Sequence, residues 1–580
     1  MLRFSGIRSP GSGIRRIALF VLLVASILPY FIDLGGSSIW DANEAFYVET
    51  PREMLQRGDF ISPTFNYLPR LNKPVLSYWI VAAFYKVFGV AVGIQRVPIA
   101  LGALAMILTA FALAKAGADP APRTDSGRSG ALEAALWAGI GLAVAPRLVM
   151  FGRRIFIDIY ISMFMALTLL FFTLAERYPS RRRLWLLLMY ACVGLGTLTK
   201  GPVAAALPAV VFGAYLLVHG ELKRIRQMMI PLGAAVILLI AVPWYAALYQ
   251  RYGWTYITSF FVGENIARYT EGVGVETRRG LLFYLPVVFS DSFPWSLCLF
   301  GAAGVWLADW RAARSTVQPF SDQRLAFRVR TLLWLWVLGI VGFFTFSAAK
   351  QDLYIFPIVP AVAALGGLFI TRDSTFGSRS SLSLRLTACA IGLLLSVAGA
   401  GTLYIFQAVG KVYALDGAAF VGAAATVGGL IALALGIANR SRAALAVVVI
   451  SLITLNWAFI IRVLPSFERY KPVPPLAAAI HSRLTDGDVV AHYNVALPSM
   501  VYYLGRHIEI LFDREKFLGL MHGPQRVYAV LSASDYEQLS AELRGTCVLD
   551  QRPTVNIKLK AVLARDPLPE VLLITNRCDR

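Results

Sequence analysis

Long apolar runs recur along most of this chain and constrain its fold more than any other feature. A helix needs about 20 apolar residues to cross the hydrocarbon core of a bilayer, and such runs follow one another as far as residue 463. They cover residues 17–34, 97–114, 132–150, 157–175, 184–198, 201–218, 229–249, 283–305, 331–347, 353–370, 386–406, 414–437 and 443–463. We therefore predict an all-α polytopic membrane protein with about thirteen transmembrane helices. The composition agrees, because 15% of the residues are charged, whereas soluble domains carry about 25%.

One further apolar segment, residues 75–92, is interpreted differently. It contains Lys86, and a span at this place would move every later loop to the other side of the membrane. We expect this segment to lie in the membrane interface or to re-enter the membrane from one side.

Basic residues in alternate loops predict the orientation of the chain, because Lys and Arg gather in cytoplasmic loops. The basic set begins with Arg3, Arg8, Arg15 and Arg16 and continues in the loops near residues 115–128, 177–183, 223–226, 311–330, 372–385 and 440–442. The N-terminus is therefore predicted to be cytoplasmic, and an odd number of spans places the C-terminus outside. The first run lacks a clear cleavage site, so we expect an uncleaved helix rather than a signal peptide.

The formal net charge of +21 is typical of some nucleic-acid-binding proteins, but basic cytoplasmic loops account for it in a membrane protein. We therefore expect no nucleic-acid partner. An anionic lipid or a phosphate is a further possible partner.

The last part of the chain, residues 465–580, is rich in charge and proline. Short β-type runs alternate there with helix-like stretches such as residues 534–543. The β-type runs are residues 488–493, 508–512, 527–531 and 571–575. We predict a transmembrane domain over residues 1–464 and an extracytoplasmic α/β domain over residues 465–580.

The cysteines fall into two groups. Cys192, Cys298 and Cys389 lie in apolar stretches and are expected to be inert packing residues. Cys547 and Cys578 lie in the outer domain and could pair if that domain faces an oxidising compartment. Spacing alone does not show that they meet.

The first external segment, residues 35–96, is too polar to be a passive connector. It contains WDANEAFYVETPREM at residues 40–54 and RLNKPVLSYW at residues 70–79. Carboxylates, a lysine and aromatic side chains therefore gather at the membrane surface, where an enzyme would meet a substrate carried by a lipid.

Several motifs in this order carry a family resemblance. After the two stretches above come RRIFID at 153–158, LTKGP at 198–202, GENIARY at 263–269, FPW at 293–295 and SAAKQDLY at 347–354. The set resembles membrane glycosyltransferases of the GT-C fold, namely the bacterial aminoarabinose (lipid A) transferases and the protein O-mannosyltransferases (family 39-like). The resemblance implies the GT-C fold and transfer of a sugar from a polyprenyl (undecaprenyl) phosphate. The implied acceptor is lipid A or another envelope glycan or protein, on the outer face of the bacterial inner membrane.

Two positions depart from the family pattern. The chain has Asn43 where the family usually has an acid thought to be catalytic, and Asn72 where it usually has Glu before Lys-Pro. The role of base therefore does not transfer to one residue. The candidate catalytic residues are Asp41, Glu44 and Asp158.

Glycosyl transfer from a lipid phosphate requires cations to neutralise the leaving group. A hydroxyl acceptor also requires a general base, whereas a phosphate acceptor is already ionised, which would make Asn43 tolerable. The predicted substrate- and phosphate-binding residues are Asn43, Tyr47, Asn72, Lys73, Tyr78, Lys200, Glu264, Arg268, Lys350 and Tyr354. No metal or other cofactor is predicted, because the histidines of the outer domain lack ligand spacing and the chain has no P-loop or Rossmann motif.

Each candidate also has a purely structural interpretation. Asp41 could cap a helix beginning near Asn43, and Asp158 could favour a helix dipole or pair with Arg153 or Arg154. Lysines near helix ends extend to the interface, aromatic side chains form a belt there, and Glu264 and Arg268 have the spacing of a helix-surface pair.

Two other functions remain open. A flippase for polyprenyl-linked sugars would place charges near the midplane, often in repeated halves. The unusual charges gather instead in one outer segment, and no repeat is visible, which favours an enzyme. An O-antigen ligase or polymerase shares the topology but does not predict the motifs at residues 40–79.

Overall fold

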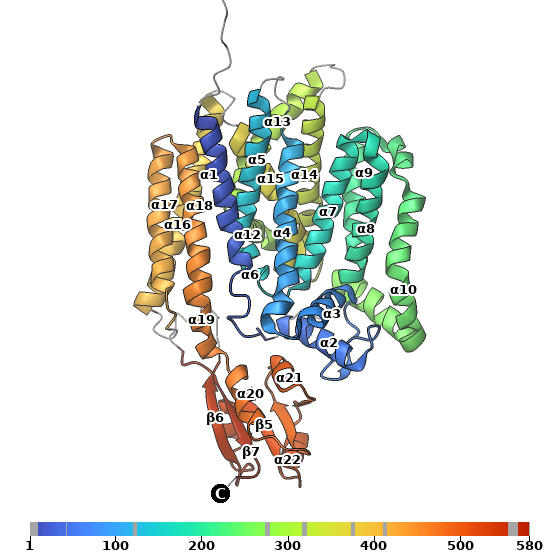
Figure 1. Ribbon diagram of the computed structural model, residues 1–580, viewed down its shortest axis with the longest axis vertical. Coiled ribbons are helices and arrows are strands. Elements are labelled where there is room, and N and C mark those ends of the chain that lie inside the picture. The colour runs from blue at the N-terminus through green and yellow to red at the C-terminus, as the bar shows by residue number, and fades with distance from the viewer. Residues whose placement is uncertain are drawn as a thin grey trace, which may run out of the picture.

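The computed structural model describes residues 10–41, 43–119, 125–272, 279–315, 322–372, 378–409, 414–554 and 566–578. They form a bundle of long helices with a small sheet domain at one end (Figure 1). Helix α1 begins at the opposite end of the bundle from the sheet domain (Figure 1).

Every predicted transmembrane run coincides with a helix. The bundle helices are α1 (Pro10–Ile27), α4 (Val92–Gly117), α5 (Asp125–Ala143), α7 (Ile157–Arg177), α8 (Arg182–Lys200), α9 (Val203–Val218), α10 (Ile230–Ile257), α12 (Tyr284–Asp291) with α13 (Cys298–Ser315), α14 (Asp322–Thr345), α15 (Val359–Arg372), α16 (Ser378–Leu403), α17 (Ala418–Ile437) and α18 (Ser441–Ala458). Within the described residues, eight segments are long and apolar enough to span a membrane, and a ninth is bent by 120° between residues 291 and 295. The all-α fold class is confirmed, and the chain is a multi-pass membrane protein.

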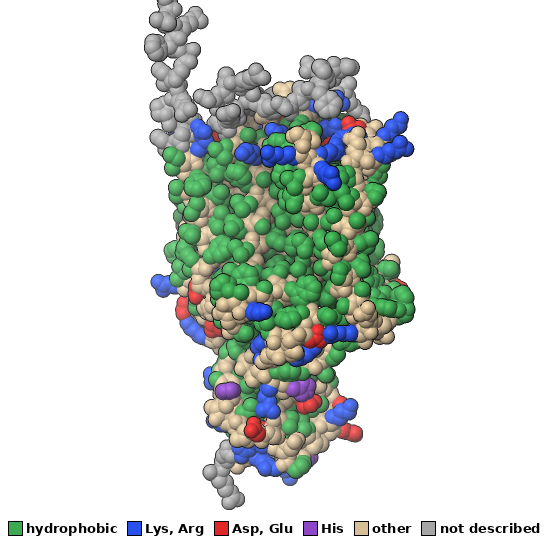
Figure 2. Space-filling model, turned by 45° about the vertical axis from the view of Figure 1, so that its right-hand side comes forward, with side chains coloured by type: hydrophobic (Ala, Val, Ile, Leu, Met, Phe, Trp, Pro, Cys, Tyr) green, Lys and Arg blue, Asp and Glu red, His purple; other side chains and the backbone are tan. Residues whose placement is uncertain are grey.

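The surface of the bundle is divided into apolar and basic regions, as expected for a membrane protein. Hydrophobic side chains cover the bundle on the face seen in Figure 2, and Lys and Arg gather on that face at the end farthest from the sheet domain. This distribution is typical of a protein whose apolar surface lies in lipid and whose basic loops lie on one side of the membrane.

Small residues allow close approach of neighbouring helices, as membrane bundles require. A Cβ atom added to Gly399 on α16 would lie 2.4 Å from the backbone nitrogen of Thr426 on α17. Added to Gly392, it would lie 2.7 Å from the backbone nitrogen of Leu433. The glycines on α16 therefore set how closely these two helices pack.

The first external segment caps the end of the bundle beside the sheet domain (Figure 1). It folds into α2 (Asn43–Arg57), a hairpin of β1 (Thr64–Phe65) and β2 (Leu68–Pro69), and α3 (Leu76–Phe88). Helix α3 has 13 residues, and at 1.5 Å per residue this is about 20 Å, too short to cross about 30 Å of hydrocarbon. This agrees with the interfacial interpretation of residues 75–92.

The sheet domain has five strands in the order β4-β3-β5-β7-β6. Strand β3 (Val489–Tyr493) pairs in parallel with β4 (Glu509–Leu511) and β5 (Val527–Ser532), and β7 (Glu570–Thr575) pairs antiparallel with β5 and β6 (Cys547–Pro553). Its helices are α20 (Val473–His481), α21 (Ser499–Leu504), α22 (Arg514–Met521) and α23 (Ala533–Gln538). The four predicted strands are confirmed.

Two local predictions in this domain were wrong. The helix expected over residues 534–543 ends at Gln538, and β6 was not predicted. Strand β6 lies at the edge of the sheet and has no fully buried position, so it lacks the apolar alternation by which strands are recognised. A disulfide joins Cys547 on β6 to Cys578 after β7. The structure therefore pairs Cys547 with Cys578, which the sequence spacing alone did not decide.

The last bundle helix continues through the predicted domain boundary. Residues 441–470 form one apolar helical segment that passes through α19 (Leu464–Ser466). The boundary between residues 464 and 465 stays a prediction.

Candidate active site

A cavity of about 800 Å³ lies where the first external segment meets the bundle. Its walls come from α2, the loop before α3, α7, α9 and α14, together with the π-helical segment η4 (Thr258–Ala267) and the turn η7 (Asp352–Ile358). Part of the lining is apolar: Ile161, Met165, Val203, Leu207, Ile266, Phe343 and Phe344. The charged lining residues are Arg70, Lys73, Asp158, Lys200, Glu264, Arg268, Arg279 and Asp352. The cavity therefore combines a charged part with walls made by membrane-spanning helices.

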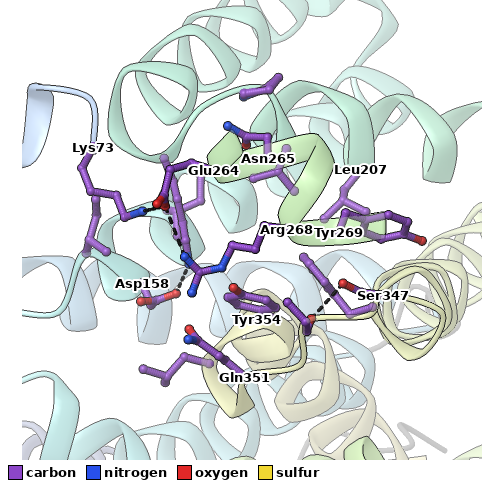
Figure 3. Close-up of a pocket in the computed structure, with 18 of the residues that line it drawn as sticks. Lys73, Asp158, Leu207, Glu264, Asn265, Arg268, Tyr269, Ser347, Gln351 and Tyr354 are labelled. Carbon is purple, nitrogen blue, oxygen red and sulfur yellow. Dashed lines mark hydrogen bonds and ion pairs between the residues drawn. The ribbon is translucent and has the colours of Figure 1, made fainter. Parts of the chain in front are cut away.

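Three cations of the cavity are held by carboxylates. Lys73 Nζ lies 2.7 Å from Glu264 Oε2, and Arg268 donates to the same oxygen at 3.2 Å. Lys200 pairs with Asp158. Figure 3 shows Arg268 reaching into the space between Glu264, Asp158 and Tyr354. Four segments far apart in the sequence thus bring their charges together.

Positive charge exceeds negative charge in this lining, which has five cations and three carboxylates. Burial lowers the pKa of Lys73, Glu264 raises it, and the neighbouring Lys200 and Arg268 lower it further. The sum is a lowered pKa, as expected for a cation that is removed from water and has other cations nearby. An added anion would relieve this repulsion, so the cavity is suited to bind one.

Aromatic side chains complete the predicted set. Lys200 Nζ lies 5.0 Å from the centre of the Tyr354 ring, within the range of a cation–π contact. Tyr47 lines the cavity and stacks on Tyr78, with ring centroids 5.6 Å apart. Tyr78 is fully buried behind it and does not itself line the cavity.

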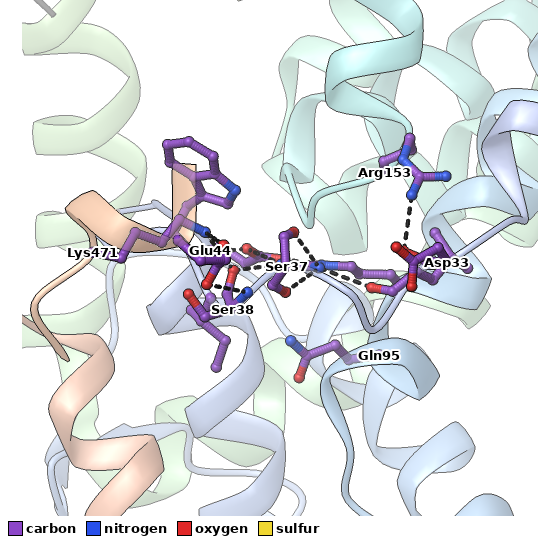
Figure 4. A network of polar contacts seen from close by, with 12 residues as sticks. Asp33, Ser37, Ser38, Glu44, Gln95, Arg153 and Lys471 are labelled. Atoms are coloured by element: carbon purple, nitrogen blue, oxygen red, sulfur yellow. Dashed lines mark hydrogen bonds and ion pairs between the residues drawn. The ribbon is translucent and has the colours of Figure 1, made fainter. Parts of the chain in front are cut away.

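Glu44 lies elsewhere. It is buried and accepts two hydrogen bonds from Arg96, at 2.8 and 2.9 Å, and one from the Trp40 backbone N–H at 3.0 Å (Figure 4). Burial acts to raise the pKa of Glu44, but Arg96 outweighs it and the pKa is lowered. This carboxylate anchors the first external segment to α4, and it is absent from the cavity lining.

Asp41 is also absent from that lining and contacts the sheet domain. Its Oδ1 accepts a hydrogen bond from the Ser499 backbone N–H at 2.9 Å, at the start of α21. Burial raises the pKa of Asp41. The placements of Asp41 and Glu44 give no support to a catalytic role, which stays a prediction for both.

The remaining predicted residues divide in the same way. Asn72 lines the cavity, and its buried Oδ1 has no hydrogen-bond partner among the described residues. Lys350 is buried outside the lining and donates to the Ser347 carbonyl at 2.6 Å. Helix α2 begins at Asn43, whose side chain lies outside the described part of the structure.

Arg153 and Arg154 do not pair with Asp158, contrary to one structural interpretation of that carboxylate. Arg153 donates to the backbone carbonyl of Asp33 at 3.0 Å, and Arg154 stacks 3.8 Å above the Trp40 ring. Lys200, the last residue of α8, takes their place, because α8 packs against α7.

Sequence reasoning missed several lining residues, of which Arg70, Arg279, Gln351 and Asp352 are polar. Arg70 lies two residues before Asn72, within the motif at residues 70–79, and its place in that motif could have predicted that it lines the cavity. Arg279 and Asp352 belong to loops whose approach to α2 depends on the packing of distant helices.

Comparisons with known proteins agree with this arrangement. Residues 17–255 match the family model of dolichyl-phosphate-mannose-protein mannosyltransferases. Undecaprenyl phosphate-alpha-4-amino-4-deoxy-L-arabinose arabinosyl transferase 1 of Pseudomonas fluorescens (strain Pf0-1) is 28% identical over 71% of this chain and 67% of its own length. The undecaprenyl phosphate-alpha-4-amino-4-deoxy-L-arabinose arabinosyl transferase of Pseudomonas aeruginosa (strain UCBPP-PA14) is 30% identical over 63% of this chain and 62% of its own length. The matched part thus spans about two thirds or less of these relatives.

A solved structure has the same fold. The crystal structure of ArnT from Cupriavidus metallidurans bound to undecaprenyl phosphate aligns with a TM-score of 0.71 and 22% identity, over 99% of both chains. The alignment extends through the bundle and the sheet domain.

Proposed function

We propose that this chain, which belongs to the membrane glycosyltransferases of the GT-C fold, transfers a sugar from a polyprenyl phosphate to an anionic acceptor of the cell envelope. One observation supports this most strongly, namely the union of a cation cluster with apolar walls in one cavity. A polyprenyl phosphate has the complementary chemistry, a charged phosphate joined to a long apolar chain. The donor named in the relatives, undecaprenyl phosphate, has this chemistry.

The cation cluster gives each step a physical basis. The bond between the anomeric carbon and the phosphate oxygen breaks, and a bond from the acceptor oxygen to that carbon forms on the opposite face. The leaving phosphate gains negative charge, which Lys73, Lys200 and Arg268 are placed to stabilise. Fixed cations in a water-poor site stabilise such charge without reorganising at the moment of reaction.

Among the three predicted catalytic carboxylates, Asp158 is the one that lines the cavity. We propose that it orients the acceptor and takes a proton if the acceptor is a hydroxyl. An acceptor phosphate brings an oxygen that is already ionised and needs no base. The presence of Asn43 in place of an acid therefore favours a phosphate acceptor, such as the phosphates of lipid A.

We also propose the orientation and location of the enzyme. The basic end of the bundle is placed in the cytoplasm of a bacterial cell, which puts the cavity and the sheet domain at the periplasmic face of the inner membrane. The Cys547–Cys578 disulfide supports this orientation, because disulfides persist in oxidising compartments.

The test is transfer of radiolabelled sugar by the purified full chain, from a panel of polyprenyl-phosphate sugars to lipid A. Lys73→Ala and Arg268→Ala should each reduce transfer about 100-fold or more, the effect of losing one group that stabilises developing charge. Lys86→Ala is the matched control, because Lys86 is an exposed lysine of the same external segment outside the cavity. Donor translocation in sealed vesicles, with no transfer to any acceptor, would contradict the proposal and favour a flippase.

A further inference from the structure

Arg70 differs from the other half-buried cations of the cavity, Lys73, Lys200 and Arg268. Lys73 and Arg268 share Glu264, and Lys200 has Asp158. Arg70 lines the same cavity but forms no ion pair with any carboxylate of the described residues. The charge of Arg70 is therefore available to a ligand.

The guanidinium of Arg70 is held in place by an aromatic ring. Its Cζ lies 3.9 Å from the centre of the Phe46 ring, and its buried Nε has no hydrogen-bond partner among the described residues. A guanidinium stacked by its face leaves the N–H groups of its edge free, and this edge matches two oxygens of a phosphate or carboxylate.

An unpartnered polar atom lies near this position, because the buried Asn72 Oδ1 has no hydrogen-bond partner among the described residues. The hydroxyl of the fully buried Tyr78 faces Arg70, which opposes the rise in its pKa caused by burial. Buried polar atoms without partners are uncommon and indicate a missing ligand or water. Burial raises the pKa of Tyr47 well above its usual value, Arg70 opposes this, and Asp158 and Glu264 add to it. Arg70 therefore lies close to the reacting part of the cavity.

We propose that Arg70, assisted by Asn72, forms a second anion subsite that binds the phosphate of the acceptor, beside the Lys73–Lys200–Arg268 cluster that binds the donor phosphate. This inference rests on the proposed function. Two subsites are needed, because a transferase with an anionic donor and an anionic acceptor must hold two mutually repelling groups at once. Arg70 supplies one positive charge beyond the ion-paired cluster.

The sheet domain sets the position of Arg70. Arg70 directly follows β2, and its backbone N–H donates to the Pro63 carbonyl at 2.9 Å. At the tip of the hairpin, the Asn66 side chain makes two hydrogen bonds with the backbone of Ile508, at 2.8 and 2.9 Å. The Tyr67 hydroxyl donates to the Gly505 carbonyl at 2.9 Å. The sheet domain thereby takes part in acceptor binding without lining the cavity.

The experiment uses the full chain reconstituted in nanodiscs, compares two acceptors, and measures the KM for the acceptor and for the donor. Lipid A with its phosphates and chemically dephosphorylated lipid A are each supplied with a saturating donor, for wild type, Arg70→Gln, Arg70→Lys and the control Arg469→Gln. Arg469 is exposed and pairs with Asp416 outside the cavity. Arg70→Gln should raise the KM for phosphorylated lipid A at least about tenfold, the loss expected for one charge-assisted contact. The KM for the donor should not change, and Arg70→Lys should recover part of the loss. Dephosphorylated lipid A lacks the accepting oxygen, so it should give no transfer with any of the four proteins.

A second measurement separates this inference from the proposed function. Equilibrium binding of both forms of lipid A is measured in the presence of undecaprenyl phosphate. Binding that depends on Arg70 and on the acceptor phosphates, without transfer by wild type, would uphold the subsite and contradict the transferase. Transfer that is unaffected in Arg70→Gln would overturn the subsite and leave the transferase standing. An equal rise in the donor KM of Arg70→Gln would show that Arg70 acts on the donor site. Lowered thermal stability of this variant would show that it acts on folding. Either result would also overturn the acceptor subsite.

Discussion

The contact between Asn66 and Ile508 is predicted to hold the first external segment against the sheet domain. Asn66 has a left-handed backbone, with φ of 56°, which Asn and Gly adopt more readily than other residues. Its side chain satisfies both the N–H and the C=O of Ile508, which is fully buried. Asn66→Gly keeps the backbone conformation and removes only these two hydrogen bonds.

The expected magnitude follows from the two groups left without partners. An orphaned buried N–H or C=O costs about 1–3 kcal/mol, so the loss of both partners in Asn66→Gly should destabilise this contact by about 2–6 kcal/mol. Asn66→Ala should add about 1 kcal/mol, because alanine is strained in a left-handed backbone. The equilibrium constant for opening this contact should increase by a factor between about 30 and about 20,000, since 1.4 kcal/mol is a factor of ten.

Hydrogen–deuterium exchange of peptides covering residues 63–70 and 505–511 measures this opening directly. Asn494→Gly is the matched control, because Asn494 has a similar left-handed φ of 54° in the sheet domain but an exposed side chain. The reasoning would be refuted if both peptides exchanged at the wild-type rate in Asn66→Gly. Faster exchange in Asn66→Ala alone would assign the effect to backbone strain instead.

Three further outcomes are expected. Gly399→Val should lower the melting temperature of the full chain, because its Cβ would lie 2.4 Å from a backbone nitrogen of α17, whereas Gly401→Val on the same helix meets nothing within 4 Å and should be tolerated. Equal melting temperatures would contradict this. Cys578→Ser opens a link across 31 residues and should destabilise the sheet domain by about 3–4 kcal/mol relative to the oxidised wild type. Urea unfolding measures this loss, and an oxidised wild type no more stable than the variant would contradict it. Burial raises the pKa of Glu53 from 4.5 to about 7, so the folded chain keeps a proton that the unfolded chain releases, and stability should fall as pH rises from 4.5 to 7. Melting temperatures between pH 5 and 8 should show a flatter profile in Glu53→Gln, and parallel profiles would exclude this role.

The cavity was predictable in part because membrane topology is readable from sequence. The loop before α3, the start of α7, the end of α8 and η4 were all expected on one side of the membrane, so Lys73, Asp158, Lys200 and Glu264 were expected near one another. Their partners were not predictable. The pairing of Asp158 with Lys200, in place of Arg153 or Arg154, depends on how α8 packs against α7.

The amino-acid sequence by itself determined the helical membrane architecture, because a backbone in lipid must satisfy its hydrogen bonds internally and each apolar run of sufficient length therefore becomes a helix. Most strands of the outer domain followed from local alternation in the same way. The tertiary structure decided which charges act together. Asp41 and Glu44 belong to the motif that includes Tyr47, yet both carboxylates lie outside the cavity lining, because Glu44, on α2, pairs with Arg96 and Asp41, before α2, accepts from Ser499. Neighbours in sequence are separated by the partners that each one contacts, and distant residues such as Lys73 and Glu264 are joined by packing, which no local pattern contains.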